Sequence, residues 1–178
     1  QWKISVGAYS NSDAKNSPIN QTLNAEQKQF LSQIGDSVQK AYFPTAYLDT
    51  FSNSKILYIK KDSIVNAKHY SIFLYQNFKT TEMYGLSFAE VGQGNGNYIP
   101  SLTAANGKVY QWVAPINNIP QGNFEPVSLL IAPKKQQLAT IKTEYKFSNN
   151  TQAILETGFS KWDINTFSSK DKKNDLGS

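Results

Sequence analysis

The stretch from Leu138 to Trp162 constrains the fold more than any other part of the chain. Apolar and polar side chains alternate along it in two runs, which are separated by Ser148-Asn149-Asn150. Only a β-strand places successive side chains on opposite faces, and Asn tolerates the positive φ angles of tight hairpin turns. The pattern therefore predicts an antiparallel β-hairpin.

One side of this predicted hairpin is apolar and the other is polar. We expect the large side chains of the apolar side to face either lipid or a protein core, and they are Ile141, Tyr145, Phe147, Leu155 and Phe159. A barrel wall between lipid and lumen and a soluble sheet with one wet face produce the same alternation. The alternation alone leaves both structures open.

Further strand-like runs occur along the chain, at residues 2–10, 55–61, 69–78, 83–91, 108–114 and 127–132. The second and third of these runs are expected to pair antiparallel through the polar connection 62–68. Apolar residues recur at helical spacing only within residues 23–41, where Thr22 or Asn24 is a candidate cap and Gly35 interrupts the pattern. The predicted fold is all-β and antiparallel, either an outer-membrane barrel-like segment or a β-sandwich, with one short helix near 23–41.

The composition limits the kinds of site and partner that the chain can have, and its two ends suggest how it is organised. The 178 residues contain no Cys, which excludes disulfides and Cys-based metal sites, and the net charge of +5 comes from lysine without any arginine. Proteins that read nucleic acids rely on the forked contacts of arginine, so we expect no nucleic-acid partner. The chain opens inside a strand-like run and closes in a charged loop, so we expect 1–178 to be a single β-rich unit from the interior of a longer chain.

Residues with catalytic or ligand-binding chemistry do not form a recognisable pattern. His69 is the single histidine and no GxSxG motif accompanies it. The GQGNGN run of residues 92–97 leads into Tyr98-Ile99-Pro100, which cannot open a helix as a dinucleotide-binding loop requires. The oxygen cluster of Asp171, Asn174 and Asp175 lacks the spacing of an EF-hand, and neighbouring lysines oppose a dication.

Paired carboxylates are the remaining enzymatic possibility. Glu144 and Glu156 are placed where they could face each other across the hairpin, as the two carboxylates of a glycoside hydrolase do. The polar face of a sheet explains the same two residues without any chemistry. We therefore predict that the chain is not an enzyme and has no catalytic residue, no metal site and no cofactor.

Aromatic residues supply a candidate binding surface. Tyr98 is expected in a Gly/Asn loop over 92–100, and Tyr110 and Trp112 in the strand 108–114. These three residues could form a stacking platform for sugars. Core residues or an interfacial belt at a membrane would have the same composition. The sequence does not separate these three interpretations.

A family resemblance favours a location in the cell envelope. The runs VGQGNGNYIPS, NGKVYQWVAP and QGNFEPVSLLIAPKKQQLATIKTEYKFS, followed by KWDINTFSSKDKKNDLG, resemble segments of large outer-membrane or cell-surface proteins of Bacteroidota. The resemblance covers about half of the chain, Tyr84 to Gly177, and rests on the overall residue composition and on the sequences of the loops. It implies an envelope location and a β-rich segment of a larger protein, and it identifies no functional residue.

The sequence thus predicts a structural segment of an outer-membrane or cell-surface β-protein involved in transport, secretion or surface assembly. Its partners would be outer-membrane lipid or other envelope proteins. The alternative is a soluble β-sandwich that binds glycans or a surface protein. The two differ in the hairpin, because a membrane wall leaves its apolar band exposed on the isolated chain and a sandwich buries it.

Overall fold

The structure is a computed structural model that describes residues 1–14, 21–102, 107–173 and 175–177. Its described residues form mainly antiparallel β-sheets together with a single α-helix, so the predicted all-β class with one short helix is confirmed. The chain divides into two compact units, where the sequence analysis treated it as one. The first unit comprises Gln1–Ala41 and Leu130–Ser178, and the second comprises Tyr42–Leu129.

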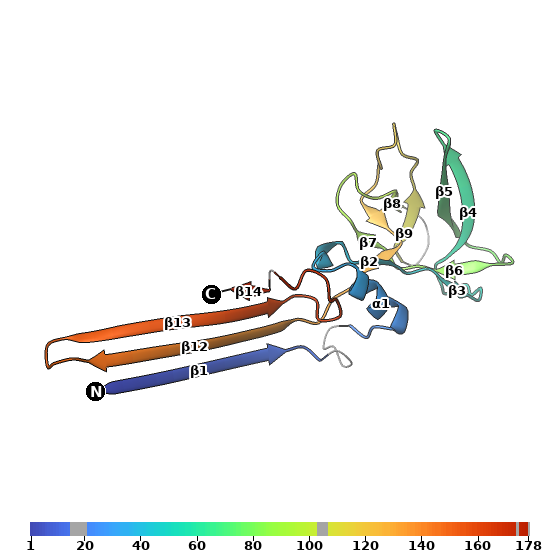
Figure 1. The fold of residues 1–178 in the computed structure, drawn as a ribbon. Helices are drawn as coiled ribbons and strands as arrows, with labels where there is room; N and C mark the ends of the chain where they lie inside the picture. The colour runs from blue at the N-terminus through green and yellow to red at the C-terminus, as the bar shows by residue number, and fades with distance from the viewer. Residues whose placement is uncertain (15–20, 103–106, 174, 178) are drawn as a thin grey trace. The chain divides into compact units, whose positions relative to one another are not determined.

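A sheet of long strands dominates the first unit (Figure 1), in the order β1-β12-β13-β14. Its strands are β1 (Trp2–Ser12), β12 (Lys135–Lys146), β13 (Gln152–Asp163) and the short β14 (Leu176–Gly177). β12 pairs with β1 over the whole length of β1 and with β13 from Lys135↔Asp163 to Lys146↔Gln152. The predicted hairpin is confirmed, with β12 beginning three residues before Leu138.

Backbone and side-chain hydrogen bonds close the short turn between β12 and β13. The amides of Phe147 and Ser148 both donate to the carbonyl oxygen of Thr151, at 3.0 and 3.2 Å. The amide of Asn150 donates to the hydroxyl oxygen of Ser148. Ser and Asn side chains satisfy backbone groups in this way in tight turns, which is why the SNN sequence ends one strand and starts the next.

The helix of the first unit is shorter than the predicted range 23–41. Helix α1 (Ala25–Gln33) begins at Asn24, whose side chain accepts from the Gln27 amide while the Gln27 side chain accepts from the Asn24 amide. It ends before Gly35, which takes a left-handed φ of 62°. A 3₁₀ turn, η1 (Val38–Lys40), follows the helix.

A small buried cluster joins α1 to the loop that follows β13. The side-chain amide of Asn165 is fully buried and donates to the carbonyl oxygens of Leu31 and Gly35, at 2.8 and 2.7 Å. It thereby satisfies backbone groups at the C-terminal end of the helix that lack partners within the helix. Leu31 is itself completely buried. The loop thus caps the helix end, a contact that bridges more than a hundred residues of sequence.

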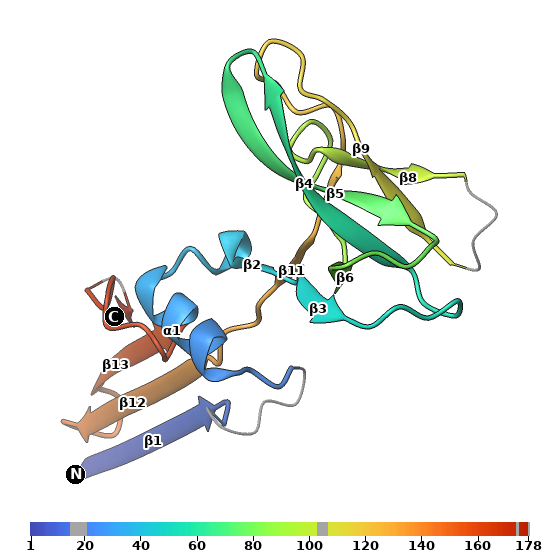
Figure 2. The same ribbon diagram turned by 90° about the vertical axis from the view of Figure 1, so that its right-hand side faces the viewer.

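The second unit is a small sandwich of two four-stranded sheets (Figure 2). One sheet has the order β3-β6-β4-β5, with β3 (Tyr47–Asp49), β6 (Met83–Gly85), β4 (Leu57–Val65) and β5 (Lys68–Gln76). The other has the order β7-β10-β8-β9, with β7 (Ala89–Glu90), β10 (Phe124–Glu125), β8 (Tyr98–Ser101) and β9 (Val109–Trp112). A separate pair joins β2 (Tyr42–Pro44) to β11 (Val127–Leu129).

The core between these sheets is aromatic. Phe88 stacks on Tyr110 with ring centroids 4.4 Å apart and meets Tyr58 and Tyr98 at 5.5 and 5.1 Å. The amide of Tyr110 donates to the hydroxyl oxygen of Tyr58 at 3.0 Å, and desolvation raises the pKa of the Tyr58 phenol. These large rings fill the core together with the buried side chains of Leu57, Ile72, Met83 and Val109.

Two sequence predictions within this unit are wrong in detail. The expected strand 83–91 is broken into β6 and β7, which lie in different sheets, because Thr45 interrupts the ladder. Its hydroxyl accepts from the Ser87 amide at 3.1 Å and donates to the Ser87 carbonyl oxygen at 2.6 Å. The pairing of β4 with β5 is confirmed, but the connection is only Asn66-Ala67, both at positive φ, instead of the polar link 62–68.

Candidate functional site: an uncovered amphipathic sheet

One face of the sheet of β1, β12 and β13 carries apolar side chains across all three strands over most of its length. Residues that pair directly across antiparallel strands share a face, so the registers define what we call the apolar face. It consists of Trp2, Ile4, Val6, Ala8, Ala139, Ile141, Thr143, Tyr145, Ala153, Leu155, Thr157 and Phe159. Only two kinds of residue, apolar ones and threonine, occupy these twelve positions.

The apolar face is uncovered by the part of the chain that the structure describes. Val6 is 72% exposed, Leu155 69% and Ile141 42%, although Ile141 lies on the central strand between β1 and β13. A soluble monomer rarely exposes so large a contiguous apolar surface, and such surfaces mark contacts with protein or membrane.

The five predicted hairpin residues are brought together as expected. Ile141, Tyr145, Leu155 and Phe159 lie on the apolar face, and Phe147 follows the end of β12 with its ring 4.7 Å from that of Tyr145. Phe147 and Phe159 are 65% and 53% exposed. Tyr145 is half-buried because Trp2 and Phe147 pack on either side of it.

Sequence reasoning missed the contribution of β1 to this face. Trp2, Ile4 and Val6 extend it by a third strand, and the Trp2 ring lies 4.7 Å from that of Tyr145. The alternation of residues 2–10 was the signal for a strand. It did not reveal the partner strand, which lies more than a hundred residues away in the sequence.

The opposite face carries a line of charges. Lys142 on the central strand lies 3.0 Å from Glu144, and Lys3 on β1 lies 3.9 Å from the same carboxylate. The hydrogen bond from Lys142, with the field of Lys3, lowers the pKa of Glu144, and the same hydrogen bond raises the pKa of Lys142. Farther along this face, Gly7, Thr140 and Gly158 form a row of small residues. Tyr9, Leu138, Ile154 and Trp162 also lie exposed on this face, so its charged part is confined to the stretch around Lys142 and Glu144.

The register argues against a catalytic carboxylate pair on this face. Glu156 pairs directly with Lys142, whereas Glu144 pairs with Ile154. A lysine therefore stands between the two carboxylates and balances both, as on an ordinary polar sheet surface. The lowered pKa of Glu144 favours its ionised form, which suits an ion pair rather than a general acid.

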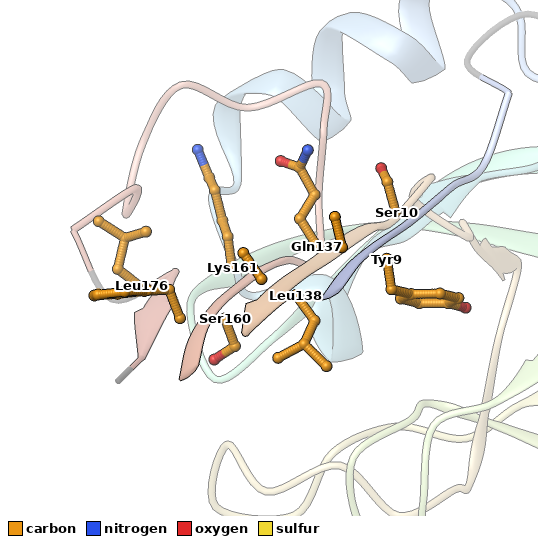
Figure 3. Close-up of a pocket in the computed structure, with 10 residues that line it drawn as sticks. Tyr9, Ser10, Gln137, Leu138, Ser160, Lys161 and Leu176 are labelled. Atoms are coloured by element: carbon orange, nitrogen blue, oxygen red, sulfur yellow. The ribbon is translucent and has the colours of Figure 1, made fainter. Parts of the chain in front are cut away.

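One hollow of this sheet is shallow and lies at the end where β14 joins. Its volume is about 450 Å³. Figure 3 shows that Ser10, Gln137 and Lys161 leave the sheet on one side, and Tyr9, Leu138 and Ser160 on the other. The lining contains no carboxylate and no imidazole, and Tyr9 and Lys161 are its titratable residues.

The three predicted platform residues also share one sheet face, but that face packs inward. Tyr98 pairs with Trp112 across β8 and β9, and Tyr110 lies two residues before Trp112. Tyr98 is 3% exposed, and Tyr110 is stacked on Phe88. Trp112 is half-buried, with its ring 6.3 Å from that of Tyr70. Tyr98 belongs to the buried aromatic core, whereas the half-buried Tyr110 and Trp112 also line a hollow of about 230 Å³ beside Leu74 and Tyr75 of β5.

Tyr98 makes the core sensitive to alkali, which gives a testable prediction. Its hydroxyl accepts from the Phe73 amide at 2.8 Å, and burial raises its pKa to about 12. The pKa of the Tyr98 phenol is higher in the folded protein than in the unfolded chain. The contribution of the neutral phenol to the stability of the fold is therefore complete below about pH 10 and is lost as pH rises towards 12. We expect the second unit to unfold in that window, which absorbance of tyrosinate with circular dichroism would follow.

Replacing Tyr98 with Phe should lower the free energy of unfolding by about 1–3 kcal/mol, since the Phe73 amide loses its acceptor. Tyr47→Phe is the matched control, because Tyr47 is 58% exposed. Equal unfolding curves for the two variants would contradict the structural role of the Tyr98 hydroxyl.

The other candidate residues form no site among the described residues. His69 is exposed on β5 opposite Ile64. Asp175 is buried with Lys172 4.0 Å from its carboxylate, and the lysine also contacts Asp163. Asn174 lies outside the described residues, and within them no group of three or more His, Cys, Asp or Glu side chains is placed to hold a metal ion.

The glycines of residues 92–97 allow backbones to cross at close range. Gly96 and Gly122 bond to each other in both directions, at 3.1 and 2.8 Å. A Cβ on Gly96 would lie 2.5 Å from the carbonyl oxygen of Phe124. The run has a packing role here.

Within the described ranges, none of the helices has the length and apolar character needed to span a membrane. Comparisons of the chain with protein-family models, with curated proteins and with solved structures find no match.

Proposed function

We propose that the sheet of β1, β12 and β13 is a sector of an outer-membrane β-barrel wall, with its apolar face against lipid and its polar face towards water. The observation that carries this proposal is the uncovered apolar face, which continues across three paired strands. Spanning sheets alternate apolar and polar residues in this way, since lipid lies on one side and an aqueous interior on the other.

The length of the apolar face supports this assignment. From Ala139 to Phe147 the strand rises about 27 Å at roughly 3.4 Å per residue. A tilt of about 40° would reduce its height to about 21 Å, close to the roughly 25 Å apolar band of such walls. The row of Ser10, Gln137 and Lys161 closes the apolar face at the β1 C-terminal end.

The aromatic residues at the other end also fit a bilayer boundary. Trp2, Tyr145 and Phe147 follow one another with ring centroids 4.7 Å apart at each step. Trp and Tyr are enriched where hydrocarbon meets headgroups, because their rings are apolar at one end and polar at the other.

The free edges of the sheet are a further support. In the described part of the chain, the outer edge of β1 pairs with no strand, and the outer edge of β13 pairs with none over residues 152–159. Long open edges invite aggregation in water, and closed walls remove them. In the proposed wall both edges pair with further strands of the full-length protein.

The test is the environment of a spin label on each face of β1. Val6→Cys and Ser5→Cys, each in a full-length protein without other cysteines, place single labels on neighbouring residues of opposite faces. In the full-length protein in lipid vesicles, we expect the Val6 label to be relaxed by oxygen, which concentrates in lipid. The Ser5 label should instead be relaxed by a water-soluble nickel complex.

Two results would overturn the proposal. A Val6 label that neither reagent reaches would mean that protein covers the apolar face, as in the alternative of a soluble sandwich. A Val6 label that the nickel complex relaxes as strongly as it does the Ser5 label would mean that the face is in water.

A further inference from the structure

The two ends of the long sheet differ in the length of the connections between its strands. At one end, β12 and β13 are joined by the short turn at residues 147–151. At the other end, the chain leaves β1 after Ser12 and returns at Lys135, and it leaves β13 after Asp163 and returns at Leu176. All of the long connections of this sheet therefore emerge at a single end.

The long connections carry folded structure. Residues 13–134 include α1 and the whole second unit. The connection between β13 and β14 contains the buried Asn165, which caps α1. Exposed lysines, among them Lys134 and Lys170, also lie in these connections. Such segments must remain in water, on whichever side of the bilayer this end of the sheet faces.

Outer-membrane walls place short turns in the periplasm and longer loops outside the cell. We propose that the connection between β1 and β12, with the aromatic-cored sandwich of Tyr42–Leu129 inside it, is displayed on the outer surface of the cell. The turn at Ser148–Asn150 then lies in the periplasm. This inference rests on the proposed membrane function and adds the side on which the sandwich meets its partners.

The test compares two exposed positions that differ only in predicted side. Lys79→Cys lies in a loop of the sandwich, and Asn149→Cys lies in the hairpin turn; both residues are exposed. The full-length protein, without other cysteines, is produced in cells with an outer membrane and treated with a maleimide too large to cross it. We expect Lys79→Cys to be labelled on intact cells and Asn149→Cys only after the outer membrane is permeabilised.

A second pair, Asn77→Cys and Asn150→Cys, guards against a variant that fails to fold, and it should give the same difference. Reversed labelling, or equal labelling of both positions on intact cells, would overturn the sidedness. If the Val6 and Ser5 labels still show lipid on one face, only the sidedness fails. If those labels place the apolar face in water or under protein, the membrane function itself fails.

Discussion

Replacing Ile141 with Arg is expected to destabilise the protein in lipid vesicles by about 2–4 kcal/mol, the cost of a cationic side chain on the lipid face near the middle of a bilayer. Ile141 lies on the central strand, flanked by Val6 and Thr157 in the same row. The charge can therefore reach water only past neighbouring strands. Urea unfolding from vesicles, followed by tryptophan fluorescence, measures the loss.

The matched control is Thr140→Arg, one residue away on the polar face. Thr140 pairs with Gly7 and Gly158, which leave room beside it. We expect this variant to unfold with nearly the free energy of the unmodified protein. A pair of variants with equal losses would show that the two faces of β12 meet the same environment, which contradicts a wall between lipid and water.

The hairpin was predictable because all of its determinants are local. Alternation from Leu138 to Trp162 and the SNN turn define strands, turn and face within 25 consecutive residues, and the structure pairs them as expected. Local residues also mark both ends of α1, because Asn24 caps its start and Gly35 follows its end. The helix is nevertheless shorter than its apolar pattern suggested. Local rules of period and capping are enough for such elements.

The sequence did not indicate which strands pair when they lie far apart along the chain. β1 alternates clearly, but nothing in residues 2–10 indicates that it joins β12 to complete the apolar face. The strand expected at 83–91 fails for the same reason, because the Thr45 hydroxyl that takes over the backbone groups of Ser87 comes from a distant segment. Contacts of this kind depend on the whole topology, and no local propensity encodes them.

The aromatic residues show a third limit. Tyr110 and Trp112 were expected in a strand, but Tyr98 was expected in a loop and lies on β8. Nothing in the sequence indicated which way the face that they share points. Tyr98 and Tyr110 have hydroxyl groups or rings that suit a binding platform as well as a core. In the structure, their partners show that both rings pack in the core: the Phe73 amide donates to the Tyr98 hydroxyl, and Phe88 stacks on Tyr110.

Replacing Gly122 with Ala is expected to lower the stability of the second unit by about 3 kcal/mol, the upper part of the usual range for overpacking. A Cβ at this position would collide with the backbone of Tyr98, including its carbonyl oxygen. Backbone held in a ladder cannot rotate away as a flexible side chain would. The amide of Gly122 also donates to Gly96 at 2.8 Å, so relieving the clash would stretch this crossing.

The graded control for this substitution is Gly94→Ala, which has an open surrounding but a φ of 72°. It should cost about 1–2 kcal/mol, the penalty of left-handed backbone for a residue with a Cβ. Trp112 becomes the single tryptophan of the chain when Trp2 and Trp162 are replaced by Phe, and its fluorescence then reports unfolding of the sandwich alone. If Gly122→Ala unfolds no earlier than Gly94→Ala, the close backbone crossing at Gly96 and Gly122 is not what holds β8 and β10 together. The GQGNGN run would then need a role other than packing.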